Sequence, residues 1–107
     1  MRTKVTFRHM KSENELHEAA TEAAERFEKF YSGISGTDII FKNEANKIVE
    51  FTVRVNGTVL VAKESSNEFN KSLNEAADKM IRQLRKWKTK FEHNSKGYIL
   101  PLKQEGY

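Results

Sequence analysis

The sequence predicts an α/β fold of the α+β kind: a two-layer sandwich in which two helices cover one face of a four-stranded mixed sheet. Three observations support this prediction. Strand-like and helix-like hydrophobic patterns follow one another in the order β-α-β-β-β-α. Asn56-Gly57, between two strand patterns, is typical of a two-residue hairpin. A helix between the first two strands implies a right-handed crossover and parallel pairing.

The first two elements follow from residue spacing. Polar and apolar residues alternate from Arg2 to Arg8, which predicts a strand with one buried face. Ser12 and Glu15 have the spacing of a capping box, and apolar residues then recur at three- and four-residue steps. We therefore expect a helix over about 13–31, with Gly33 as its left-handed C-terminal cap.

Three further strands are predicted after Gly36, over 37–42, 48–55 and 58–63. Because the Asn56-Gly57 turn fixes the register, Val55 should lie opposite Thr58 on the core face. On the other face Arg54 should lie opposite Val59. We expect this second face to be mixed in character and open to water.

The longest predicted element is a helix over about 66–93. Ser65 and Glu68 again have the spacing of a capping box. Its apolar stripe contains Phe69, Leu73, Ala76, Ala77, Met80, Leu84, Trp87 and Phe91. The last residues contain Pro101 and no periodicity. We therefore expect a single domain over 1–95 and a flexible tail over 96–107.

Composition excludes several functional classes. The 107 residues include no cysteine, which excludes disulfides, Cys-ligated zinc and thiol catalysis. His9, His17 and His93 are widely separated, and no glycine-rich phosphate loop or hydrolase motif is present. We expect no enzyme activity, no cofactor and no metal site. With no apolar run long enough for a signal or membrane span, we also expect a cytoplasmic protein without a membrane partner.

Charge is segregated along the chain. The net charge is +4, but residues 1–11 contribute +4, residues 12–75 contribute −5 and residues 76–107 contribute +5. Six bases and no acid occur between positions 79 and 90: Lys79, Arg82, Arg85, Lys86, Lys88 and Lys90. One or two cations suffice to offset a helix dipole, and neighbouring like charges repel. The run therefore favours a polyanionic partner over a merely solvated face.

Three sequence segments resemble a known family. They are Arg8-His9, Leu60-Val61-Ala62 and, most specifically, a Lys-x-x-Arg-Gln-Leu-x-Lys pattern at Lys79, Arg82, Gln83, Leu84 and Lys86. Together they resemble the bacterial ribosome hibernation promoting factors and ribosome-associated translation inhibitors, once called sigma-fifty-four modulation proteins, over about residues 1–93. The resemblance is to the short family type. It implies the same β-α-β-β-β-α order and binding in the decoding channel of the small ribosomal subunit, where messenger and transfer RNA are excluded when growth slows.

Two functions from different classes remain open at this point. The first is a ribosome-binding translation inhibitor. For this function we expect no DNA partner and leave open whether another hibernation factor is a partner. The inhibitor's expected contacts with ribosomal RNA phosphates are Lys79, Arg82, Arg85, Lys86, Lys88 and Lys90, with Arg2, Lys4 and Arg8 as a second basic strip. The second is a small protein-interaction module that uses the open sheet face, with the basic helix serving solubility only.

Overall fold

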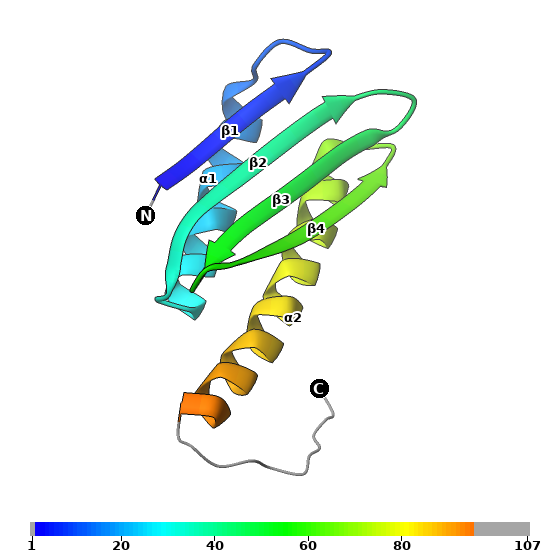
Figure 1. Cartoon of the computed structure of the whole chain (residues 1–107). Helices are drawn as coiled ribbons and strands as arrows, with labels where there is room; N and C mark the ends of the chain where they lie inside the picture. Colours follow the sequence, from blue (N-terminus) through cyan, green and yellow to red (C-terminus); the bar gives the residue numbers. More distant parts are fainter. Residues whose placement is uncertain (1, 96–107) are drawn as a thin grey trace.

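A computed structural model describes residues 2–95 of the chain, with side chains up to residue 89. Its elements are β1 (Arg2–Arg8), α1 (Asn14–Phe30), β2 (Ile34–Asn43), β3 (Lys47–Val55), β4 (Thr58–Ser66) and α2 (Phe69–Ser95). Both helices lie behind the same face of the sheet (Figure 1). The predicted two-layer sandwich and its β-α-β-β-β-α order are confirmed.

The sheet has the strand order β1-β2-β3-β4. β1 pairs with β2 in parallel, as the helical crossover requires, and the other two pairs are antiparallel. Asn56 and Gly57 adopt positive φ angles of 51° and 79°, the conformation of a tight two-residue hairpin. Val55 lies opposite Thr58 and Arg54 lies opposite Val59, which confirms the predicted register.

The hydrophobic core lies between the sheet and the two helices. Phe27 of α1 meets Phe51 of β3 edge to face, with ring centroids 5.1 Å apart, and both side chains are fully buried. On α2, Met80 and Leu84 are equally buried. These contacts fix the rotation of α2 about its axis and decide which of its other side chains face solvent.

Both predicted signals at the ends of α1 are wrong. Glu13, in an extended conformation and without a side-chain cap hydrogen bond, occupies the N-cap position in place of Ser12. At the other end, Tyr31 is extended, with φ −146°, and its N–H donates to the carbonyl of Phe27. The chain therefore passes directly into β2 at Ile34, three residues earlier than predicted, without a left-handed turn at Gly33. Strand pairing with β3 replaces a helix cap here.

The predicted start of α2 is also wrong. β4 continues to Ser66 because β3 offers partners as far as Lys47, so Ser65 belongs to the strand. The hydroxyl of Ser66, not Ser65, accepts a hydrogen bond from the Glu68 N–H at 3.2 Å. The helix consequently begins at Phe69.

The predicted tail over 96–107 lies outside the described residues, so the division of the chain at residue 95 stays a prediction. Among the described residues, no helix is apolar enough over a sufficient length to cross a membrane.

Candidate nucleic-acid interface

Three of the predicted binding residues form an exposed cationic surface on α2. Arg82, Arg85 and Lys86 are exposed and lie across the helix from the buried Met80 and Leu84. Because that buried stripe faces the sheet, these three side chains project away from it. No ion pair joins any of them to another described residue. We call Arg82, Arg85 and Lys86 the α2 surface; it offers uncompensated positive charge to a partner.

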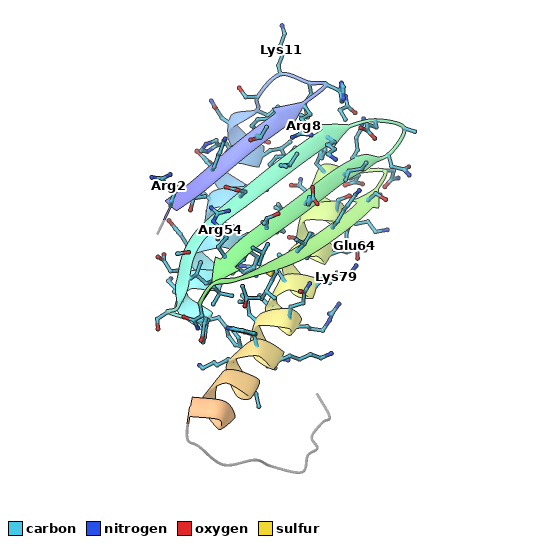
Figure 2. All side chains as sticks on the ribbon, viewed as in Figure 1. Arg2, Arg8, Lys11, Arg54, Glu64 and Lys79 are labelled. Carbon is cyan, nitrogen blue, oxygen red and sulfur yellow. The ribbon has the colours of Figure 1, made fainter. Side chains whose placement is uncertain are left out.

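Lys79 occupies a different position from the α2 surface. Its Nζ lies 2.7 Å from Oε2 of Glu64 on β4 and donates to the carbonyl of Lys63 at 3.5 Å. Figure 2 shows Lys79 and Glu64 side by side where α2 passes behind β4. The Lys79 side chain is 44% exposed, so it is still within reach of a partner, but its charge is already matched within the fold.

Gln83 lies one turn further along α2 and contacts the same strand. Its Nε2 donates to the carbonyl of Val61 at 2.7 Å. β4 is an edge strand, and unpaired edge carbonyls are sites for unwanted strand pairing. We call these three residues, Lys79, Gln83 and Glu64, the β4 clamp. Sequence reasoning missed it, although a neutral amide inside a run of cations was a usable signal.

Lys88 points away from β4 and toward α1. Its Nζ lies 5.5 Å from the ring centroid of Phe30, at the end of α1, in cation–π geometry. The side chain is partly buried, so Lys88 joins the two helices as well as carrying charge. Lys90 belongs to α2, but its side chain lies outside the described residues.

Arg2, Lys4 and Arg8 alternate along β1 and are all exposed on the face of the sheet that no described helix covers. Arg8 lies directly opposite Lys42 of β2. Like charges in this position repel one another, and a bound anion would relieve the repulsion. The structure therefore places the β1 cations and the α2 surface on opposite sides of the sandwich, not on one continuous face.

Arg54 is a further cation on this open face that was not among the predicted binding residues. Its Nη1 lies 3.0 Å from Oδ2 of Asp38 on the neighbouring strand, and 40% of its side chain is exposed. The predicted register had already placed Arg54 on the wet face, but spacing along one strand does not reveal a partner on another.

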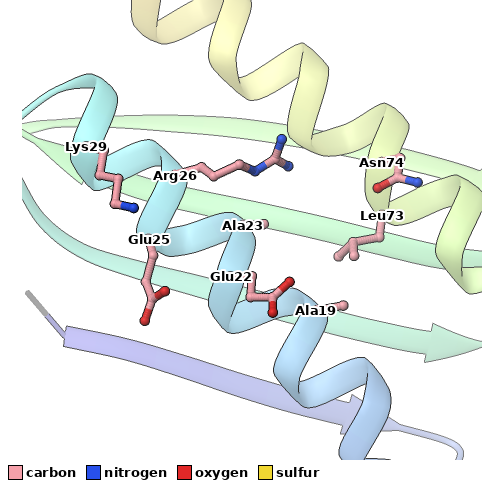
Figure 3. A pocket seen from close by; sticks show the side chains of 8 residues that line it. All are labelled: Ala19, Glu22, Ala23, Glu25, Arg26, Lys29, Leu73 and Asn74. Carbon is pink, nitrogen blue, oxygen red and sulfur yellow. The ribbon is translucent and has the colours of Figure 1, made fainter.

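A groove of about 400 Å³ lies between the two helices (Figure 3). Arg26 and Lys29 line it together with Glu22 and Glu25. Charges of both signs balance there, in contrast to the α2 surface. Among the side chains that the structure describes, up to residue 89, no three of His, Cys, Asp or Glu are grouped so that they could hold a metal ion.

The sequence and the fold of the chain both have counterparts among known proteins. The family model described as sigma 54 modulation protein / S30EA ribosomal protein matches residues 3–92. A ribosomal subunit interface protein from Coxiella burnetii is 27% identical, with a TM-score of 0.76 over 83% of this chain and 99% of that one. The N-terminal domain of Thermus thermophilus Protein Y shares the fold at 13% identity, with a TM-score of 0.72 over 78% of this chain and 94% of that one. No curated protein matches the sequence. The chain belongs to the sigma 54 modulation protein / S30EA ribosomal protein family.

Proposed function

We propose that this protein is a ribosome-associated translation inhibitor of the hibernation type. It binds the small ribosomal subunit near the decoding channel and sterically excludes messenger and transfer RNA. In this proposal it acts in the cytoplasm, without catalysis, metal or cofactor. Family membership supports association with the ribosome, as does the likeness to a subunit interface protein.

The α2 surface is the single observation that carries the choice of partner. Three exposed cations project from one helix without a described acidic partner. Ribosomal RNA presents closely spaced phosphates, and neutralising each phosphate releases counterions and favours binding. We assign Arg82, Arg85 and Lys86 to these phosphates, with Lys88 and Lys90 further along the helix.

Arg2, Lys4 and Arg8 supply a second basic strip in this proposal. Because they lie on the other side of the sandwich, they contact a different part of the RNA from that bound by α2. Lys79 contributes less than its position in the sequence suggests, since Glu64 already neutralises it.

A protein-interaction module remains the alternative, and one observation favours it. Val59 and Val61 are 56% and 46% exposed on β4 and extend the open face with apolar surface. Such a module would retain its partner at high salt, because apolar burial does not depend on counterion release.

Co-sedimentation with purified small subunits tests the proposal. Arg82→Glu with Lys86→Glu should abolish most of the binding, while Lys11→Glu with Lys29→Glu, which changes the net charge equally at two exposed sites elsewhere, should retain it. Circular dichroism should show all variants folded, since surface changes usually alter stability by about 0.5 kcal/mol or less. Binding by the α2 double variant equal to wild type, or binding unchanged between low and moderate salt, would contradict the proposal.

A further inference from the structure

Arg54 has an unusual setting on the open face of the sheet. It lies directly opposite Gly36 of β2, and its guanidinium reaches along that strand to Asp38, 3.0 Å away. The ion pair fixes one edge of the guanidinium. Because 40% of the side chain is exposed, the group is held in place without being covered.

Gly36 provides the space that the guanidinium occupies. A Cβ at this position would lie 2.6 Å from Nη2 of Arg54 and 3.3 Å from both Cζ and Nε. Gly36 does not have a positive φ, so the reason for glycine here is room and not backbone conformation. Arg54 therefore rests against the β2 backbone where any other residue would place its own side chain.

The surroundings of Arg54 are strongly cationic. The strand register assigns six bases to the open face, Arg2, Lys4, Arg8, Lys42, Arg54 and Lys63, and two acids, Asp38 and Glu50. Of these acids, Asp38 is already paired with Arg54. Arg2 lies opposite Gly36 and Lys4 lies opposite Asp38, so two further cations flank the fixed guanidinium on the β1 side.

We propose that Arg54, held over Gly36 by Asp38, is a stacking platform for an unpaired base of single-stranded RNA. Arg2 and Lys4 bind the adjoining phosphates. Guanidinium planes stack on bases that are splayed out of single strands. The register places no aromatic residue among the described side chains of the open face. Of the three guanidinium planes there, on Arg2, Arg8 and Arg54, only that of Arg54 is held by an ion pair to a described residue. The carboxylates of an acidic protein segment would pair with the edge of the guanidinium, part of which Asp38 already occupies, and would leave the face of the plane unused.

The inference rests on the proposed function for its partner, RNA, but it uses the side of the sandwich opposite to the α2 surface. It also differs from a purely structural reading, in which the Arg54–Asp38 pair only joins two strands. A lysine at position 54 would keep the charge and remain able to pair with Asp38, but it would remove the plane. Charge and stacking can therefore be separated experimentally.

The test uses the full chain and a pentaribonucleotide with one 2-aminopurine between uridines, with binding followed by the quenching of its fluorescence. Arg54→Lys should weaken binding about 5- to 150-fold, the range expected for loss of one stacked base, and reduce the quenching. The slope of affinity against salt should stay unchanged, since no charge is lost. Arg26→Lys, the same change at an exposed arginine of α1 that belongs to neither basic surface, is the matched control and should bind as wild type.

Two further measurements make the result decisive. A pentamer with an abasic site in place of the 2-aminopurine, measured as a competitor of the fluorescent pentamer, should bind wild type and Arg54→Lys equally. Gly36→Ala displaces the guanidinium without changing the charge. If circular dichroism shows this variant folded, it should lose affinity and quenching as Arg54→Lys does. If Gly36→Ala does not fold, the comparison of Arg54→Lys with Arg26→Lys decides alone.

Equal affinity and quenching for wild type and Arg54→Lys would overturn the inference. So would tighter binding of a polyglutamate peptide than of the RNA probe, which would indicate a protein partner. The α2 double variant separates this inference from the proposed function: it should lose the small subunit but still quench the pentamer. If wild type quenches the pentamer and ignores the small subunit, the proposed function fails and the platform stands.

Discussion

The two basic segments of the chain, in α2 and in β1, differ in how much of their charge is free. The α2 run is the richer in sequence, yet Lys79 is paired with Glu64 and Lys88 lies over the ring of Phe30. On β1, Arg2, Lys4 and Arg8 are all exposed, and no ion pair joins them to a described residue. The number of bases in a sequence run therefore overstates the charge that a partner can reach, because packing assigns some of the bases to the fold.

The two segments also depend differently on the core. The α2 surface is positioned by buried side chains, so Leu84→Ala, which removes a fully buried one, should lower the free energy of unfolding by about 2–5 kcal/mol. Arg2→Ala, at an exposed residue of β1, should change it by about 0.5 kcal/mol or less. Urea denaturation measures both. A small effect of Leu84→Ala would mean that the buried stripe of Met80 and Leu84 does not anchor α2 to the sheet.

A second, smaller effect is expected at the β4 clamp. Gln83→Leu removes the hydrogen bond to the Val61 carbonyl and should destabilise the protein by about 1 kcal/mol. The change also exposes the free edge of β4, so concentration-dependent association by light scattering is expected. Asn70→Leu, which also replaces an amide with leucine but at an exposed residue of α2, is the control. Unchanged stability in Gln83→Leu would show that the clamp contributes nothing.

Much of this arrangement was predictable from the sequence because it depends on periodicity and local turn chemistry. The β-α-β-β-β-α order of elements, the Asn56-Gly57 turn and the register of β3 with β4 all follow from short-range patterns. Two of the failures share a cause. The Gly33 cap and the Ser65 capping box are local signals that strand pairing overrode, because Ile34 and Ser66 were drawn into strands by partners on β3. The Ser12 signal failed differently, since Glu13 occupies the N-cap position of α1.

The candidate site shows the same limit. Helical spacing correctly predicts that Arg82 and Lys86 avoid the buried stripe. It does not distinguish Arg82 from Lys79, since the difference is Glu64, 15 positions earlier on another element. Nor does it reveal that Gly36 makes room for Arg54, because that contact joins two strands.

The salt dependence of small-subunit binding should reflect this difference between Lys79 and Arg82. The eight cations assigned to phosphates, five on α2 and three on β1, would give a slope of about −6 to −7 in log K against log salt. Arg82→Gln should make the slope shallower by about 0.7 to 0.9, the value of one contact, whereas Lys79→Gln should change it much less. Equal changes in the two variants would mean that Lys79 leaves Glu64 when RNA binds.

The smallest expected effect is the most informative about the clamp. Glu64→Gln removes the partner of Lys79 and should cost no more than about 1 kcal/mol of stability, as is usual for a partly exposed ion pair. The freed Lys79 can then reach a phosphate, so the variant should bind small subunits more tightly and with a steeper salt slope. Loss of any acid raises the net charge, so Glu18→Gln, an exposed acid on α1, is the matched control and should give a smaller gain. If the two variants gain equally, the effect is one of net charge, and the pairing of Lys79 with Glu64 does not limit binding.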